Sequence, residues 1–244
     1  MGDPIMAGEV RKSFGEQVVL DGVSFQVRRG ETLAVLGRSG TGKSVLLKLL
    51  VGLQRPDSGS ICVAGQEITE LDGKALNEIR KKMGFLFQQA ALYDSLTVGQ
   101  NVGFPLGRHS QLDDAARDQK VRELLQSVGM EGELDKLPAD ISGGMKKRVG
   151  LARALALDPE ILLCDEPTAG LDPITSAEIG QLIIDLQKQR QMTTIVVTHD
   201  IRGAKTFADR VIVLNEGKVV AEGDFAALEQ STDPFVSRFM EEAK

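Results

Sequence analysis

The sequence is poor in aromatic residues and in cysteine, and it has no apolar run long enough to cross a membrane. Its 244 residues include no tryptophan, one tyrosine and two cysteines. Cys62 and Cys164 lie in apolar runs and suggest no disulfide framework, so we expect buried thiols in a reducing compartment. The longest apolar stretch, VLLKLLVGL, is interrupted by Lys48 and is too short to span a bilayer. A function at a membrane would therefore require docking to an embedded partner.

Positive charge is also not in excess. The formal net charge is −6, which disfavours binding to nucleic acid through neutralised phosphates, so we expect no nucleic-acid partner. The first ten residues, MGDPIMAGEV, lack the charged and apolar regions of a secretory signal. Met6 breaks the myristoylation pattern. We therefore expect neither a secretory signal nor that lipid anchor here.

Strand and helix patterns divide the chain into two kinds of segment. Short strand patterns dominate the first third, and strands alternate with helices from residue 158 onwards, whereas residues 90–157 carry only helical patterns. The runs ILLC and TIVV are apolar without a break, as in parallel strands covered on both faces. We predict a single α/β domain over 1–244, with a core at about 1–89 and 158–244 and an inserted helical part at about 90–157.

A glycine-rich loop between a predicted strand and a predicted helix is the first chemical motif. It matches the phosphate-binding pattern G-x-x-x-x-G-K-[ST] in the context that supports it. Its glycines allow backbone N–H groups to point into one hollow, the lysine can reach the β- and γ-phosphates, and the serine can ligate Mg²⁺. We therefore predict nucleotide binding by Gly37, Arg38, Ser39, Gly40, Thr41, Gly42, Lys43 and Ser44.

Polar residues end the strands that follow. Asp165 and Glu166 close the apolar strand ILLC, which suggests a magnesium ligand and a general base for an attacking water. His199 ends the strand TTIVVT, where it can hold a γ-phosphate oxygen and the water, although a structural histidine is an alternative. Gln88 follows the strand MGFLF and can ligate Mg²⁺ or orient water; alone it is a weak signal. Asp172 before Pro173 is typical of a helix start.

A second phosphate-facing turn lies about a hundred residues beyond the first. In ISGGMKKR, small polar residues precede a basic helical run, the chemistry of an anion site at a helix N-terminus. A simple helix cap is the alternative. The order of a phosphate loop, this SGG turn, DEPTAGLDP and the histidine-ended strand TIVVTHD resembles the ATP-binding-cassette (ABC) ATPases over essentially the whole chain.

The resemblance implies a P-loop α/β core with an antiparallel β subdomain, ATP and Mg²⁺ as cofactors, and a head-to-tail homodimer. In that family each SGG turn caps the γ-phosphate held by the other copy, here through Ser142, Gly143 and Gly144. Phe14 would stack on adenine with Val18 nearby, a core position being the alternative for Phe14. Asp172 would lie at the dimer seam.

Met145 replaces the glutamine that most of the family carries after SGG. SGGM with basic residues, FPLGRHSQL and DPFVSRFM are similar to the ATPases of the Mla and Mce phospholipid-trafficking systems. That implies a bacterial ATPase on the cytoplasmic face of the inner membrane, with an integral membrane (MlaE-like) permease, a periplasmic Mce-domain (MlaD-like) protein and, in the Mla version, a STAS-domain (MlaB-like) protein. The cargo would be phospholipid moving between the inner and outer membranes.

Several alternatives remain. A transporter for another solute, such as amino acids, has the same ATPase motifs. A small-molecule kinase or GTPase would not need the SGG turn, and no N-K-x-D motif is present. Cassette proteins of translation or DNA repair usually fuse two cassettes or insert a coiled coil. Tyr93 and Leu96 would line the permease groove or belong to the core of the helical part.

Overall fold

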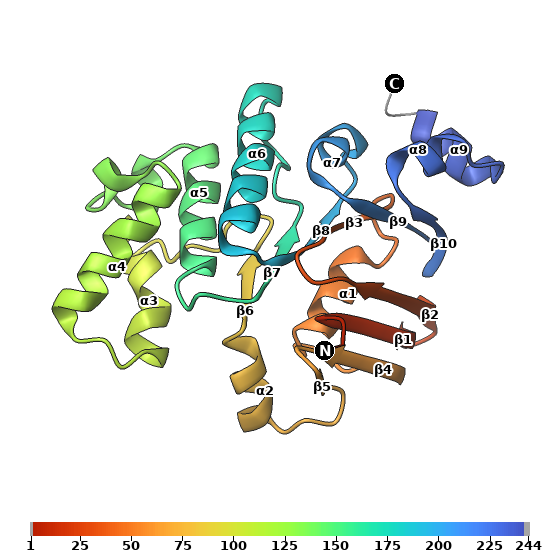
Figure 1. The fold of residues 1–244 in the computed structure, drawn as a ribbon, viewed down its shortest axis with the longest axis horizontal. Coiled ribbons are helices and arrows are strands. Elements are labelled where there is room, and N and C mark those ends of the chain that lie inside the picture. Colours follow the sequence, from red (N-terminus) through yellow and green to blue (C-terminus); the bar gives the residue numbers. More distant parts are fainter. Residues whose placement is uncertain (1, 242–244) are drawn as a thin grey trace.

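A computed structural model describes residues 2–241, in which two sheets pack with helices around them (Figure 1). The larger sheet has the order β10-β9-β3-β8-β7-β6, and all its neighbours are parallel except the β10–β9 pair. Its strands are β3 (Thr32–Leu36), β6 (Met83–Leu86), β7 (Ile161–Asp165), β8 (Thr193–Thr198), β9 (Arg210–Asn215) and β10 (Lys218–Gly223).

The smaller sheet is antiparallel and has the order β2-β1-β4-β5. It consists of β1 (Ile5–Phe14), β2 (Gln17–Val27), β4 (Ser58–Val63) and β5 (Gln66–Glu67). The pairing of β1 with β2 is irregular, with register shifts that include the step from Lys12 to Ser13. In Figure 1 this sheet lies on the opposite side of the molecule from the helices of residues 98–154.

Helices surround the larger sheet and fill the segment between β6 and β7. The helices are α1 (Lys43–Leu50), α2 (Gly73–Arg80), α3 (Val98–His109), α4 (Asp114–Ser127), α5 (Gly143–Ala154), α6 (Pro173–Arg190), α7 (Ile201–Phe207), α8 (Phe225–Glu229) and α9 (Pro234–Glu241), with 3₁₀ turns at Glu131–Glu133 and Pro138–Asp140. Within residues 2–241, none of them combines the length and the apolar character that a bilayer crossing needs.

The two faces of the larger sheet belong to two different apolar clusters. On β3, Leu33 and Val35 pack with α1, α2 and the antiparallel sheet, whereas Ala34 and Leu36 pack with α6, α7 and the helices α3–α5. This alternation follows from the period of two along a strand. It explains why β7 and β8 contain apolar runs without a break, ILLC and TIVV, in the parts that are covered on both faces.

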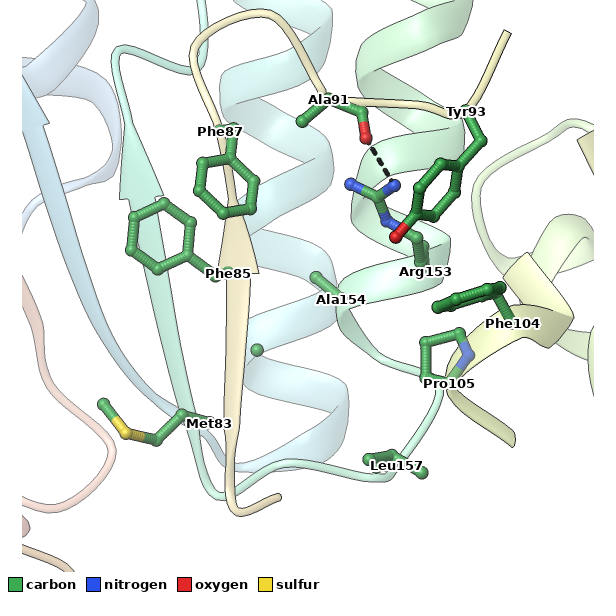
Figure 2. A pocket seen from close by; sticks show the side chains of 11 residues that line it. Met83, Phe85, Phe87, Ala91, Tyr93, Phe104, Pro105, Arg153, Ala154 and Leu157 are labelled. Atoms are coloured by element: carbon green, nitrogen blue, oxygen red, sulfur yellow. Dashed lines mark hydrogen bonds between the residues drawn. The ribbon is translucent and has the colours of Figure 1, made fainter. Parts of the chain in front are cut away.

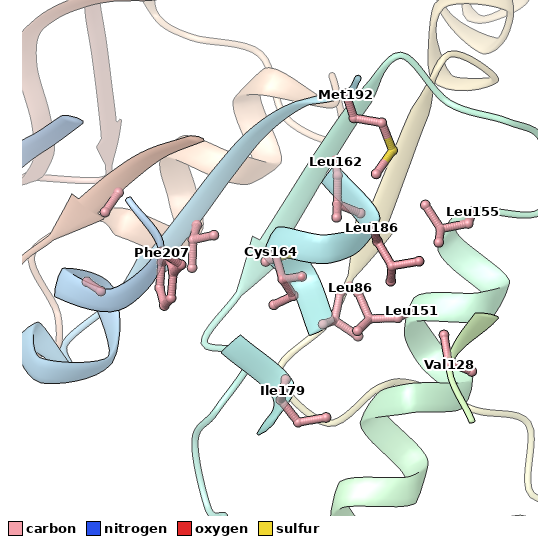
Figure 3. Packing of buried hydrophobic residues seen from close by; sticks show 14 of the residues in the cluster. Leu86, Val128, Leu151, Leu155, Leu162, Cys164, Ile179, Leu186, Met192 and Phe207 are labelled. Carbon is pink, nitrogen blue, oxygen red and sulfur yellow. The ribbon is translucent and has the colours of Figure 1, made fainter. Parts of the chain in front are cut away.

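The second cluster runs without interruption from the sheet into the helical segment. Leu86 of β6 and Leu162 and Cys164 of β7 share it with Leu151 of α5 and with Leu155, which directly follows α5 (Figure 3). Burial raises the pKa of the Cys164 thiol to about 12, so this thiol stays protonated and behaves as an apolar side chain. The cluster fixes α5 against the strands that carry the candidate site.

Candidate functional site

The glycine-rich loop links the end of β3 to the start of α1. Gly42 caps the helix with φ 101°, and a Cβ atom there would lie 2.7 Å from Leu20 Cδ2, so this position requires glycine. The Lys43 ammonium is buried and donates to the carbonyl oxygens of Gly37 at 2.7 Å and Arg38 at 3.0 Å. The loop thus curls around the lysine.

The remaining loop residues lie around the same turn. Gly40 also has a positive φ of 83°, and the Thr41 hydroxyl donates to the Arg38 carbonyl at 2.9 Å. Burial lowers the pKa of Lys43, and the nearby carboxylates of Glu166 and Asp165 oppose that shift. A cationic ammonium at the base of a curled loop is suited to bind the phosphates of a nucleotide.

Ser44 and Asp165 meet beneath this loop. The Ser44 hydroxyl donates to Asp165 Oδ1 at 3.1 Å, which joins the first turn of α1 to the end of β7. Burial raises the pKa of Asp165, the Ser44 hydrogen bond lowers it, and Glu166 raises it. Two hard oxygen atoms side by side fit Mg²⁺, which usually takes one or two carboxylates together with substrate phosphates. Within residues 2–241 no cluster of three His, Cys, Asp or Glu side chains forms an all-protein metal cage.

Glu166 is the most constrained acid of the site. It has the left-handed φ of 46°, a conformation that costs about 1–3 kcal/mol for a residue with a side chain. Its Oε2 accepts the Thr198 hydroxyl at 3.0 Å and lies 3.0 Å from Nδ1 of His199. Its Oε1 lies 3.7 Å from the Lys43 ammonium. Glu166 therefore links the ends of β7 and β8 to the glycine-rich loop.

These groups surround one hollow of about 310 Å³. Gln88, which follows β6, is one of the residues that line it. The lining residues are Val19, Ser39, Gly40, Gly42, Lys43, Ser44, Val45, Gln88, Glu166 and His199. The carboxyl ends of β3, β6, β7 and β8 thus converge there, as is usual for ligand sites in open parallel sheets. The arrangement can bind phosphates and hold a water molecule beside a carboxylate.

The SGG turn does not line this hollow. Ser142 is exposed and caps α5 by accepting the Met145 N–H at 3.3 Å; Gly143 and Gly144 form the first turn. Asp172 caps α6, accepts the N–H groups of Ile174 and Thr175 at 3.0 Å each, and is exposed. Backbone hydrogen bonds and the hydroxyl of Thr175 lower the pKa of Asp172. Both turns thus present a polar end to the surface.

The predicted adenine residues lie at the tip of the β1–β2 hairpin. Phe14 is 46% exposed, so the core position considered for it is wrong; the Lys12 ammonium lies 5.5 Å from the centre of its ring. Val18 is 61% exposed, and its neighbour Val19 lines the hollow instead. Phe14 does not line the hollow, but its ring is accessible at the end of this hairpin.

Sequence reasoning did not identify two cations of α5, the buried Lys147 and the half-buried Arg153. Lys147 is 4% exposed, and its ammonium donates to the carbonyl oxygens of Gln88 and, at 3.1 Å, Glu166. Arg153 donates to the carbonyl oxygens of Ala90 at 2.6 Å and Ala91 at 2.7 Å. The basic run KKR in the SGG segment was the available signal for Lys147.

A groove of about 500 Å³ lies beside the loop that starts at Gln88. Figure 2 shows its aromatic wall and Arg153, which reaches across to Ala91. Tyr93 lines this groove, whereas Leu96 lines a different hollow between α3 and α4. The groove is lined by Met83, Gly84, Phe85, Phe87, Ala91, Tyr93, Phe104, Pro105, Arg153, Ala154 and Leu157.

Comparison with known proteins places these features in a family. The family model described as "ABC transporter" matches residues 20–169. The probable ribonucleotide transport ATP-binding protein mkl of Mycobacterium leprae is 44% identical over 240 residues, which cover 98% of this chain and 69% of the relative. The methionine import ATP-binding protein MetN of Brucella abortus is 44% identical over 215 residues, which cover 88% of this chain and 58% of the relative.

Solved structures agree with the sequence relatives. The cbiO1 protein of Clostridium perfringens, described as part of the ABC transporter complex cbiONQ, gives a TM-score of 0.85 at 30% identity and covers 99% of this chain and 100% of its own. A dimeric ATP-binding cassette, MJ0796 bound to ADP and Pi, gives 0.82 at 35% identity, with coverage of 90% and 98%. These similarities confirm the predicted fold class, a phosphate-loop α/β core with an antiparallel sheet and a helical part.

Proposed function

Because this chain belongs to the ABC transporter family and is an ATPase that hydrolyses ATP for transport, we propose that it works as a homodimer with two shared ATP sites. The observation that carries the proposal is the separation of the two phosphate-facing turns. The glycine-rich loop lines a hollow in its own chain, whereas Ser142 and Gly144 do not line it. A second copy can bring its SGG turn to this loop, and the related MJ0796 cassette is a dimer.

The proposed hydrolysis uses groups already in contact. Lys43 and the loop amides hold the phosphates, and Ser44 with Asp165 would hold Mg²⁺, which neutralises phosphate charge when bound. Glu166 accepts a proton from the attacking water, and His199 and Gln88 orient that water. Loss of the γ-phosphate then removes the negative charge that donors of both copies bind. Without this shared anion, the two copies separate more readily.

Three variants test the shared site. With ATP and Mg²⁺, Glu166→Gln is expected to hydrolyse about a hundredfold more slowly and to run as a dimer in light scattering. Adding Ser142→Ala should weaken dimerisation while ATP still binds the monomer. Lys43→Ala in the Glu166→Gln background should prevent ATP binding itself. An ATP-loaded Glu166→Gln protein that stays monomeric, or one that hydrolyses at the normal rate, would overturn the shared-site mechanism.

We also propose that the aromatic groove receives a cytoplasmic helix of an integral membrane permease. The groove combines apolar side chains with the Arg153 guanidinium, and its wall continues through Phe87 into Gln88. An amphipathic helix with an acidic residue would bury its apolar face there and pair with that cation. This would place the protein at the cytoplasmic face of the membrane. Binding of the permease helix in the groove would then be linked to the ATP site through Gln88.

For the cargo, we propose phospholipid moved between the inner and outer membranes of a bacterium. The support is the sequence resemblance to the Mla and Mce ATPases, which implies an Mce-domain protein and a STAS-domain protein as further partners. The similarity to a methionine importer favours amino acids as a second candidate, and the mkl relative is named for ribonucleotides.

The cargo test uses the Glu166→Gln dimer as bait. The tagged full chain is purified from its own membranes with ATP, the permease is identified by mass spectrometry, and bound lipid is quantified against a detergent-matched control. Phospholipid enriched with a permease and an Mce-domain protein would support lipid transport. A permease that co-purifies with an amino-acid-binding protein and no enriched lipid would contradict it.

A further inference from the structure

Lys147 carries its charge in a buried position that is unfavourable for a cation. It lies one turn into α5, which begins at Gly143, yet the positive end of the helix dipole disfavours a cation there. Burial also lowers the pKa of its ammonium. A methionine of similar length could fill this apolar place without the cost of desolvating a charge. The reason for a lysine at this position therefore lies in what its ammonium contacts.

The contacts of Lys147 join two separate parts of the candidate site. One carbonyl belongs to Gln88, which follows β6, and the other to Glu166, which follows β7. Hydrogen bonds from a charged donor are stronger than those between neutral groups. A single ammonium thus holds the backbone of both residues from the helix that begins at the SGG turn.

Both segments that Lys147 holds have constrained backbones. Glu166 has a φ of 46°, and Ala90 and Ala91, just after Gln88, have φ values of 57° and 48°. Such conformations persist only where surrounding contacts enforce them. Arg153 holds the carbonyl oxygens of Ala90 and Ala91 from the other end of α5, and Figure 2 shows its reach to Ala91. Residues near both ends of helix α5 therefore hold this loop by hydrogen bonds to its backbone.

We propose that Lys147 is a positioning residue that fixes Gln88 and Glu166 relative to the SGG turn of the same chain. The inference rests on the proposed roles of these residues in ATP hydrolysis. When the dimer closes, a shift of α5 moves the Glu166 carboxylate and the Gln88 loop together, because Lys147 connects both to the helix. Lys147 acts on the rate of hydrolysis and contributes little to ATP binding, because the phosphate loop does not depend on it.

The test compares two substitutions that a packing role and a positioning role rank differently. Both replacements are one bond shorter than lysine: Lys147→Met keeps an unbranched apolar side chain without a donor, whereas Lys147→Gln keeps N–H donors. We expect kcat to fall about tenfold in Lys147→Met and about threefold in Lys147→Gln, with KM for ATP changed by less than about twofold. If only packing mattered, Met would be the better replacement.

Lys146→Met provides the matched control. Lys146 is the next residue of α5, points about 100° away around the helix and is partly exposed. We expect it to keep the kcat and KM of the unchanged protein. Hydrogen exchange gives the second readout: peptides covering 87–93 and 166–171 should exchange faster in Lys147→Met and not in Lys146→Met.

The outcomes separate this inference from the function on which it rests. Normal kcat together with normal exchange in Lys147→Met, or in Lys147→Gln if the Met variant does not fold, would overturn the role of Lys147. A loss in Lys147→Met no larger than that in Lys147→Gln would also overturn it, since the missing donor would then make no difference. Normal hydrolysis by Glu166→Gln would instead overturn the proposed base, whatever Lys147 does.

Discussion

The side chain of Thr175 leaves no room for a Cβ atom on Gly144. Such an atom would lie 2.6 Å from Thr175 Cγ2, far inside normal contact distance. The hydroxyl of the same threonine donates to Asp172 Oδ2 at 2.6 Å. Thr175 therefore packs its methyl group against the SGG turn and holds the Asp172 turn with its oxygen, which brings the starts of α5 and α6 together.

Gly144→Ala should displace the start of α5. Overpacking of this kind costs about 1–3 kcal/mol, so we expect a lower melting temperature and weaker ATP-dependent dimerisation in the Glu166→Gln background. The second change Thr175→Ser removes the methyl group and keeps the hydroxyl. The double variant should recover much of both losses, and a double variant no better than Gly144→Ala would contradict the packing explanation.

Asp165→Asn should stabilise the protein while it damages the magnesium site. Burial raises the pKa of Asp165, so the charged form is disfavoured in the fold and this residue contributes less stability as pH rises through its raised pKa. An asparagine stays neutral and still accepts the Ser44 hydroxyl. Without nucleotide at pH 7, we expect a melting temperature higher by a few degrees, of the order that a kcal/mol produces.

The pH dependence checks the cause of that stabilisation. The difference in melting temperature between Asp165→Asn and the unchanged protein should shrink as pH falls to the ordinary Asp pKa of 3.8 and below, where both side chains are neutral. Mg²⁺-dependent hydrolysis should be lost at every pH. A difference that grows on acidification would show that burial of charge is not its origin.

Phe14→Ala should weaken ATP binding with little effect on folding. Because Phe14 is largely exposed, its removal takes little from the core. Stacking of a base on an aromatic ring contributes about 1–3 kcal/mol, so the dissociation constant of ATP should rise at least about fivefold. Leu53→Ala is the control, since Leu53 is 57% exposed and lies outside the hollow. Equal affinities in the two variants would remove Phe14 from the nucleotide site.

Tyr93→Asp should disrupt the proposed permease contact. The ring of Tyr93 packs against that of Phe104 at a 45° tilt, with ring centres 4.8 Å apart, and together they form the apolar wall next to Arg153. A carboxylate there would pair with Arg153 and repel an acidic partner helix. We expect at least about a tenfold loss of co-purified permease, measured by quantitative mass spectrometry. Leu112→Asp, an exposed leucine outside this groove, should retain it.

The phosphate loop and the strand ends could be predicted because local sequence determines them. Glycines flanking Lys43 and the uninterrupted run before Asp165 carry the information within a few residues. The parallel order of the larger sheet then brings Lys43, Asp165 and His199 to one edge without further information.

Features that depend on packing between distant segments could not be predicted. In the run KKR, only the phase of α5 against β6 and β7 decides that Lys147 is buried while Lys146 is partly exposed. The same holds for Val18 and Val19, because irregular pairing of β1 with β2 sets which of them faces the hollow. Such register is not encoded in residue type alone.

The ammonium of Lys43 already uses two of its donors on its own loop. A ligand that binds the Lys43 ammonium must compete with the carbonyl oxygens of Gly37 and Arg38. A triphosphate brings enough negative charge to compensate for those bonds, whereas inorganic phosphate or a monophosphate offers much less. The loop thereby discriminates among cellular anions by charge, and the abundant small ones are poor competitors for it.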